Sequence, residues 1–291
     1  MTGYEIAVFA AKFAFGSAAF LLIGFIGASD DKRVAGAMLA FPTLNGIGMV
    51  TSLDRDPVAL AAAMMPMIAF NGILFFAFIV AFRALRQWLR GAGDRALSYG
   101  VGVAGAAIWF LIAWCAAPWL APLVPPAWWI VLYGVLTAVM TIAFWSRGES
   151  ARTSSRIERP AFAPFWRARL GRVGFFAVSL FLLLVVANVG TAEWIGRLSA
   201  LPLVPLCVLA GIAIDDRDSL PLVRDPIFIG PWLSMFFVAG LMQALLCIRP
   251  AGELAYWTVG IAGLALGWTL CFLAFRYGVP PLAAALDRRR R

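Results

Sequence analysis

The residues best placed to do chemistry lie where proline interrupts two apolar stretches, 34–52 and 196–214. A proline inside a helix removes a backbone hydrogen bond and bends or breaks the helix. At membrane depth the freed backbone groups need a partner in protein, water or ligand. Paired interruptions in two antiparallel halves predict the central site of a transporter, whereas a packing kink is the structural alternative. The candidate substrate-binding residues here are Pro42, Thr43, Asn45, Pro202 and Pro205.

Two further polar residues lie inside apolar stretches. Lys12 lies about two turns into the stretch 5–28, where a cation is costly and indicates function. Its ammonium suits an anionic substrate group or a lipid phosphate, and the alternative is that it reaches back to the headgroups. Asn71 lies in the stretch 57–82. An amide at such depth usually bonds across helices, and Asn71 is also a candidate for substrate binding.

Clustered carboxylates offer a different chemistry. Asp215, Asp216 and Asp218 resemble the Asp-rich clusters with which membrane prenyltransferases hold magnesium diphosphate, because Mg²⁺ prefers oxygen ligands. The second acidic corner, 54–56, is predicted on the opposite face of the membrane, so the two corners cannot share one metal. Arginines also adjoin these aspartates and the nearby Asp225, which favours solvated turns and helix caps at all of them. A lipid-modifying transferase therefore remains the enzyme alternative.

Composition places the chain among membrane proteins. Of its 291 residues, 63% are hydrophobic and only 13% are charged, which is too little polar surface for a soluble domain of this size. No histidine occurs, so histidine proton shuttles, metal sites and catalytic triads are excluded, and we expect no cofactor. The net charge of +9 is concentrated in short segments beside apolar stretches, which indicates membrane topology and contact with anionic lipid rather than nucleic acid.

The hydropathy pattern predicts an all-α polytopic membrane protein with about nine transmembrane helices. The predicted spans are 5–28, 34–52, 57–82, 97–117, 127–146, 171–191, 196–214, 226–248 and 254–277. Basic segments at 83–96, at 147–170 and at the Arg-rich C-terminus are expected inside. The uncharged, Trp-flanked segment 118–126 is expected outside. This topology places the N-terminus outside and the C-terminus in the cytoplasm, in a bacterial inner membrane.

A weak internal repeat gives these spans an order. Lys12, Phe15, Leu22, Gly36, Ala40 and Pro42 align with Arg172, Phe175, Leu182, Gly196, Ala200 and Pro202. One intervening crossing makes the two copies antiparallel, which is how many secondary transporters are built. The predicted units are 1–96 with spans one to three, 97–117 with span four, 118–146 with spacer span five, 147–170 as a cytoplasmic basic loop, and 171–291 as the second repeat with spans six to nine and the tail.

Short motifs between residues 11 and 85 resemble the GlpM family of small bacterial inner-membrane proteins. They are Lys12, 21–24 (Leu-Leu-Ile-Gly), 35–36 (Ala-Gly), 41–43 (Phe-Pro-Thr) and the acidic–basic pair 54–55. The resemblance implies four hydrophobic spans per unit and a link to alginate production. The second half departs from this pattern, with Leu201-Pro202-Leu203 in place of Phe-Pro-Thr and Arg172 in place of the lysine.

These features together predict a transporter or flippase-like protein for a small anionic or lipid-linked substrate, working by alternating access of inverted repeats. Membrane lipids are its expected partners, and a homodimer is compatible with the sequence. A scaffold in envelope polysaccharide secretion, without a site of its own, is the third alternative. It predicts tight packing around Pro42 and Pro202.

Overall fold

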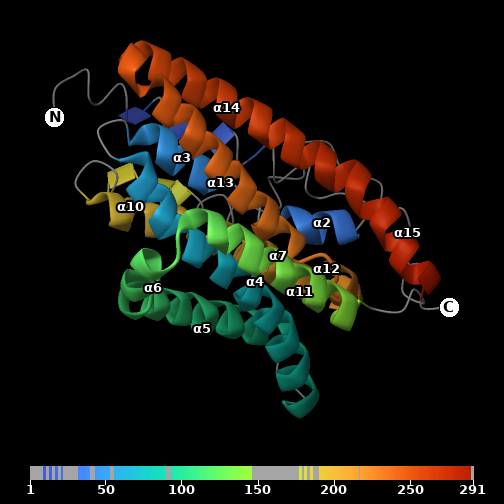
Figure 1. Cartoon of the computed structure of the whole chain (residues 1–291). Coiled ribbons are helices and arrows are strands. Elements are labelled where there is room, and N and C mark those ends of the chain that lie inside the picture. The colour runs from blue at the N-terminus through green and yellow to red at the C-terminus, as the bar shows by residue number, and fades with distance from the viewer. Residues whose placement is uncertain are drawn as a thin grey trace.

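The chain folds as a bundle of helices (Figure 1). The computed structural model describes residues 32–39, 43–52, 56–89, 93–145, 190–215 and 217–289, and isolated helical positions between 9 and 21 and between 177 and 185. About 91% of these residues are helical, and no strand occurs among them. The predicted all-α class is therefore confirmed for the part of the chain that the structure describes.

Five helical segments are long and apolar enough to cross a membrane. They are α4 (Pro57–Trp88), α5 (Asp94–Cys115), α7 (Pro126–Phe144), α12 (Leu220–Arg224) followed by α13 (Ile229–Ile248), and α14 (Glu253–Leu273) followed by α15 (Val279–Arg289). A π-helical turn, Ala274–Gly278, joins α14 to α15, and 3₁₀ turns, Arg217–Ser219 and Arg249–Ala251, precede α12 and follow α13. These lengths and compositions support a multi-helix membrane protein.

Two of the predicted spans each contain two short helices. In the first half, α2 (Lys32–Met38) is followed by α3 (Thr43–Thr51). In the second half, α10 (Ala192–Ser199) is followed by α11 (Leu203–Asp215), and residues 200–202 between them are not helical. Pro202 lacks an N–H and disfavours helix in the residue before it, which accounts for this break. The predicted interruption of the stretch 196–214 is therefore confirmed.

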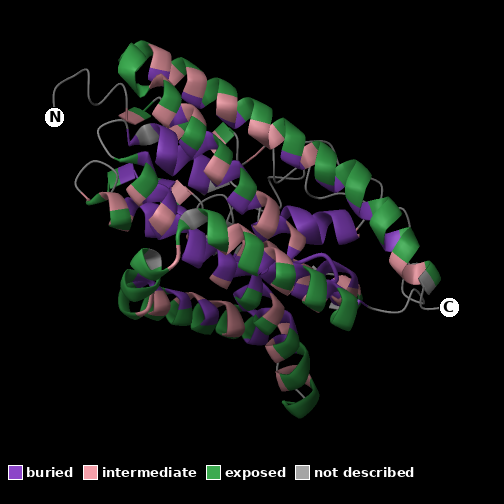
Figure 2. Ribbon diagram, viewed as in Figure 1, coloured by how far each residue is buried: buried purple, intermediate pink, exposed green. Residues whose placement is uncertain are grey.

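The centre of the bundle is α4, which contacts α5, α7, α10 and α13. Helices α2 and α3 are mostly buried and α10 is half buried, whereas α5, α7 and α14 expose much of their surface (Figure 2). Large apolar side chains dominate that exposed surface, among them Val103, Leu111, Val135, Ile142 and Leu266. An apolar exterior around a packed centre is the arrangement expected of a bundle surrounded by lipid.

The two divided spans place their short helices at opposite ends of the bundle (Figure 1). One end holds α2, α12 and α15, and we call it the α2 end. The other end holds α10 and α3, and we call it the α10 end. Helix α2 packs on α12, and α10 packs on α4.

Several boundaries differ from those predicted by hydropathy. Helix α4 continues to Trp88 instead of ending at 82, because backbone hydrogen bonding persists through its polar last turns. The segment predicted as the loop 118–126 contains a short helix, α6 (Ala117–Leu123), whose first turn accommodates Pro118. The Arg-rich tail is helical to Arg289 as α15.

Candidate functional site

The two short helices α2 and α10 dock through glycine. A Cβ added to Gly36 of α2 would overlap the backbone of Val223 in α12, and one added to Gly196 of α10 would overlap the backbone of Leu60 in α4. Each glycine thus lets two helix backbones approach more closely than any side chain would allow. The short helix of each half is therefore set against a long segment of the other half.

Two hydroxyl groups tie the second parts of the divided spans to the outer helices. Ser98 Oγ on α5 donates to the carbonyl of Ala210 on α11 at 3.1 Å. Tyr256 Oη on α14 donates to the carbonyl of Met49 on α3 at 3.4 Å. Each bond again joins one half of the chain to the other.

Asn71 lies in the middle of α4 and reaches the break between α10 and α11. Its Nδ2 donates to the carbonyl of Ala200 at 2.7 Å, and its Oδ1 accepts from Trp109 Nε1 of α5 at 2.8 Å. Asn71 is only 8% exposed. The amide therefore links α4, α5 and the broken helix, which is the interhelical role expected of an amide at this depth.

The remaining predicted site residues lie around the same two breaks. Asn45 is buried on α3, Pro202 is buried in the non-helical segment, and Pro205 is half-buried in α11. Thr43 begins α3. Lys12 and Pro42 lie outside the described residues, and so the structure gives them no place.

Helix α3 packs closely on the end of α10. A Cβ added to Gly48 would overlap the side chain of Ser199, the last residue of α10. A Cβ added to Gly46 would likewise overlap the side chains of Leu264 and Phe237. The structure therefore brings Asn45's helix against the break of the second half, with small residues at the contact.

The acidic corners do not assemble a metal site in the described part of the chain. Asp56 caps α4, its carboxylate accepting from Val58 N at 2.9 Å, and Asp218 is exposed before α12. Asp215 ends α11, and Asp216 lies outside the described residues. No group of three or more histidine, cysteine, aspartate or glutamate side chains with metal-binding geometry occurs among the residues searched.

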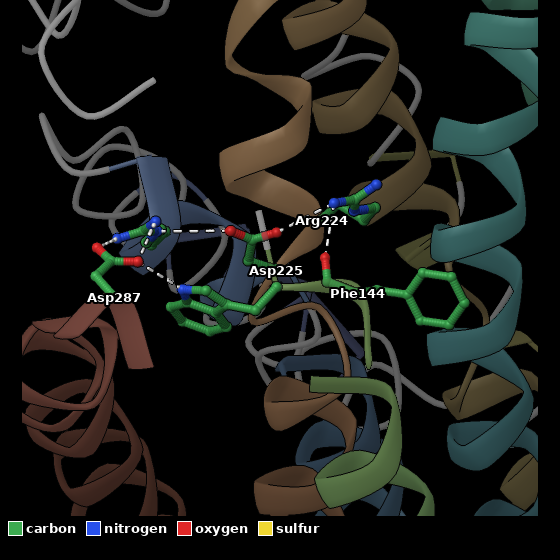
Figure 3. Close-up of polar contacts among 6 residues, drawn as sticks. Phe144, Arg224, Asp225 and Asp287 are labelled. Atoms are coloured by element: carbon green, nitrogen blue, oxygen red, sulfur yellow. Dashed lines mark hydrogen bonds and ion pairs between the residues drawn. The ribbon is translucent and has the colours of Figure 1, made fainter. Parts of the chain in front are cut away.

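A buried cluster of charges occupies the α2 end instead (Figure 3). Arg33 of α2 is 7% exposed. Its Nη1 lies 3.0 Å from Asp287 Oδ2 of α15, and its Nε lies 3.7 Å from Asp225 Oδ2, just after α12. Trp145 donates from Nε1 to Asp287 Oδ1 at 2.9 Å, and its ring lies 4.9 Å from the guanidinium carbon of Arg33. We call these residues, with Arg224, the Arg33 cluster.

Arg224 completes the Arg33 cluster from the other side of Asp225. Its Nη2 donates to the carbonyl of Phe144 at 2.7 Å and lies 3.4 Å from Asp225 Oδ1 (Figure 3). Two arginines and two aspartates therefore share one ion network. The prediction that Asp225 lies in a solvated turn is wrong, because this residue is only 2% exposed and is ion-paired.

Comparison with known proteins assigns no relative to this arrangement. No family model, curated protein or solved structure matches the chain. Its function must therefore be inferred from the broken helices and the buried charges.

Sequence reasoning missed both buried arginines of the short helices. Arg33 follows a charged run, 30–32, and so resembles an ordinary loop residue. Its partner Asp287 is 254 residues away, which no local pattern reveals. Arg197 of α10 did carry a signal, because it is a charged residue inside the predicted span 196–214.

Proposed function

We propose that this chain is a membrane carrier built from two inverted four-helix repeats joined by a spacer helix, with nine crossings in all. The two broken spans, 34–52 and 196–214, form its centre. Its substrate is a small anionic or lipid-linked molecule, and Lys12 supplies positive charge. Transport proceeds by rocking one repeat against the other around the fixed central site.

The reciprocal docking of α2 and α10 carries this proposal. Gly36 and Gly196 are equivalent in the sequence repeat. Gly36 touches α12 and Gly196 touches the start of α4, and these two segments also correspond, because the run Asp-Arg-Asp precedes each of them, at 54–56 and at 216–218. A twofold relation between the halves requires such an exchange of partners. The position of α2 and α10 at opposite ends of the bundle further supports an inverted relation (Figure 1).

The hydroxyl bonds support the same relation independently. Ser98 and Tyr256 each belong to the fourth span of a repeat, and Ala210 and Met49 each belong to the second part of a broken span. Two unrelated side chains thus make corresponding interhelical bonds. The local sequence has diverged while the arrangement is kept, which fits an old duplication.

Orientation and cellular location follow from charge. The basic segments 83–96 and 147–170 and the tail belong on the cytoplasmic face of a bacterial inner membrane, and the N-terminus belongs outside. The α2 end is then the cytoplasmic end. The likeness of residues 11–85 to the GlpM family supports a four-span unit in the first half of the chain.

In this proposal the Arg33 cluster closes the cytoplasmic end. It joins α2 to α15 through Asp287 and to the start of the α12–α13 segment through Asp225. Opening toward the cytoplasm separates these elements and exposes the cluster to water. The energy of the ion pairs therefore sets how often the cytoplasmic end opens.

A single-cysteine experiment tests alternating access. Cys115, Cys207, Cys247 and Cys271 are replaced by serine, and Asn45→Cys is introduced beside the first break. A membrane-impermeant maleimide is then applied to right-side-out and to everted vesicles. We expect labelling from both sides. Arg33→Gln should raise the labelling rate from the cytoplasmic side, about tenfold for every 1.4 kcal/mol by which it destabilises the closed cytoplasmic end.

Arg288→Gln is the matched control, because Arg288 is exposed on α15 and donates only to Ala284 of its own helix. It should leave both labelling rates unchanged. Protection of the cysteine from both sides, with and without Arg33→Gln, would contradict a carrier and favour a packed scaffold.

A further inference from the structure

The α10 end contains a buried arginine that lacks the carboxylates given to Arg33. Arg197 of α10 is 7% exposed. Glu193, one turn earlier, is exposed, and its charge acts on Arg197 without forming an ion pair. No carboxylate among the described residues lies within ion-pair distance of its guanidinium. An uncompensated buried cation is costly, so its presence needs an explanation.

The contacts that Arg197 does make are weak. Its Nη1 donates to the carbonyl of Ala113 at 3.5 Å, the far limit for a hydrogen bond, and its guanidinium carbon lies 5.0 Å from the ring centre of Trp194. Its Nε is buried and has no hydrogen-bond partner. A guanidinium offers five N–H donors, so most of its capacity is left for another group.

The surroundings of Arg197 indicate where that group comes from. The Trp194 ring lies 5.1 Å from the ring of Trp114, which is 69% exposed on α5. Trp119, on the short helix α6 that follows, is also exposed. Exposed tryptophans at a helix end are typical of the lipid headgroup layer. The headgroup layer is rich in phosphate, which the planar fork of arginine binds with two parallel hydrogen bonds.

We propose that Arg197 and Trp194 form a binding site for a phosphate group at the junction of α10 with the end of α5. The phosphate belongs either to a phospholipid headgroup or to a free phosphate anion. This site lies at the opposite end from the Arg33 cluster (Figure 1) and does not depend on the transport proposed above.

Ligand binding to the full-length protein in detergent tests this site. The probes are dioctanoyl phosphatidic acid, dioctanoylglycerol, which shares its chains but lacks the phosphate, and inorganic phosphate at constant ionic strength. Microscale thermophoresis should show saturable binding of phosphatidic acid and none of dioctanoylglycerol. Arg197→Gln should weaken that binding about tenfold or more.

Arg249→Gln is the control, because Arg249 is an exposed arginine after α13, and it should bind as the wild type does. Inorganic phosphate that binds with the same dependence on Arg197 would identify a free-anion site, whereas binding of the lipid alone would identify a headgroup site. The proposal is overturned if the wild type binds neither probe, or if Arg197→Gln binds as tightly as Arg249→Gln.

Stability provides the second measurement. Arg197→Gln removes an unpaired buried charge, so we expect it to fold. Should it not, the unfolding temperature of the wild type decides, because a ligand that binds only the folded state raises it. A rise with phosphatidic acid and not with dioctanoylglycerol supports the site, and no rise with either phosphate probe overturns it.

Discussion

Asn71 shows how one polar residue can organise several helices. Its amide oxygen accepts from Trp109, and its amide nitrogen donates to the carbonyl of Ala200. The break after α10 leaves that carbonyl without its usual helical donor. A backbone carbonyl freed by a helix break at membrane depth needs such a partner. Asn71 therefore supplies the hydrogen bond that the break in the helix takes away from Ala200.

Replacing Asn71 with leucine tests this role. The change leaves the Ala200 carbonyl and the Trp109 N–H without their partner, so we expect the free energy of unfolding to fall by about 2 kcal/mol. Unfolding in mixed detergent micelles measures it. Thr258→Val is the control, because Thr258 is exposed and bonds only Leu254 of its own helix. An equal loss in both variants would argue against a special role for Asn71.

Sequence could identify Asn71 and the prolines because their effects are local. An amide stands out inside an apolar stretch whatever surrounds it, and a proline always lacks the N–H that a helix uses. The Arg33 cluster could not be predicted in this way. Its members come from α2, α12, α15 and the end of α7, and only the packing of those elements makes the charges neighbours.

Among the helices, the close contacts at Gly36 and Gly196 define how the halves fit together. Each glycine faces the backbone of a partner helix, which cannot move aside as a flexible side chain can. Such positions tolerate no added atom. The docking of α2 and of α10 should therefore respond alike to the same substitution.

Gly36→Ala and Gly196→Ala are each expected to lower the free energy of unfolding by about 1–3 kcal/mol. Gly240→Ala on α13 is the matched control, because nothing lies within 4 Å of the added Cβ. It should leave stability unchanged or raise it, since alanine favours helix by about 1 kcal/mol. Thermal unfolding of the three purified variants measures the difference. A loss at only one of the two glycines would contradict equivalent docking.

Helix boundaries were predicted less well than helix breaks, for a physical reason. Proline removes a backbone hydrogen bond, and Pro202 coincides with the break between α10 and α11, although Pro66 lies inside the continuous helix α4. The end of an apolar run marks only where a helix leaves the lipid. Helices α4 and α15 continue past that point through polar residues such as Arg86 and Arg288, because water does not end a helix.

For the whole molecule, the proposed inversion makes a direct prediction about sidedness. Val58 near the start of α4 and Asp218 before α12 are both exposed and are near the two acidic corners. In the cysteine-free background, Val58→Cys should react with impermeant maleimide only from outside. Asp218→Cys should react only from the cytoplasm. Labelling of both from one side would contradict the inversion and favour the Asp-rich transferase.

The continuous helix from Glu253 to Arg289 has a mechanical consequence. Its first part packs on α3, with Tyr256 bonded to Met49, and its last part holds α2 through Asp287 and Arg33. One continuous helix thus contacts both α3 and α2. Any motion of α2 relative to α3 must therefore bend this helix or break its contacts with one of the two. We expect the bend to occur at the π-helical turn 274–278, because the regular α-helical hydrogen bonding is interrupted there.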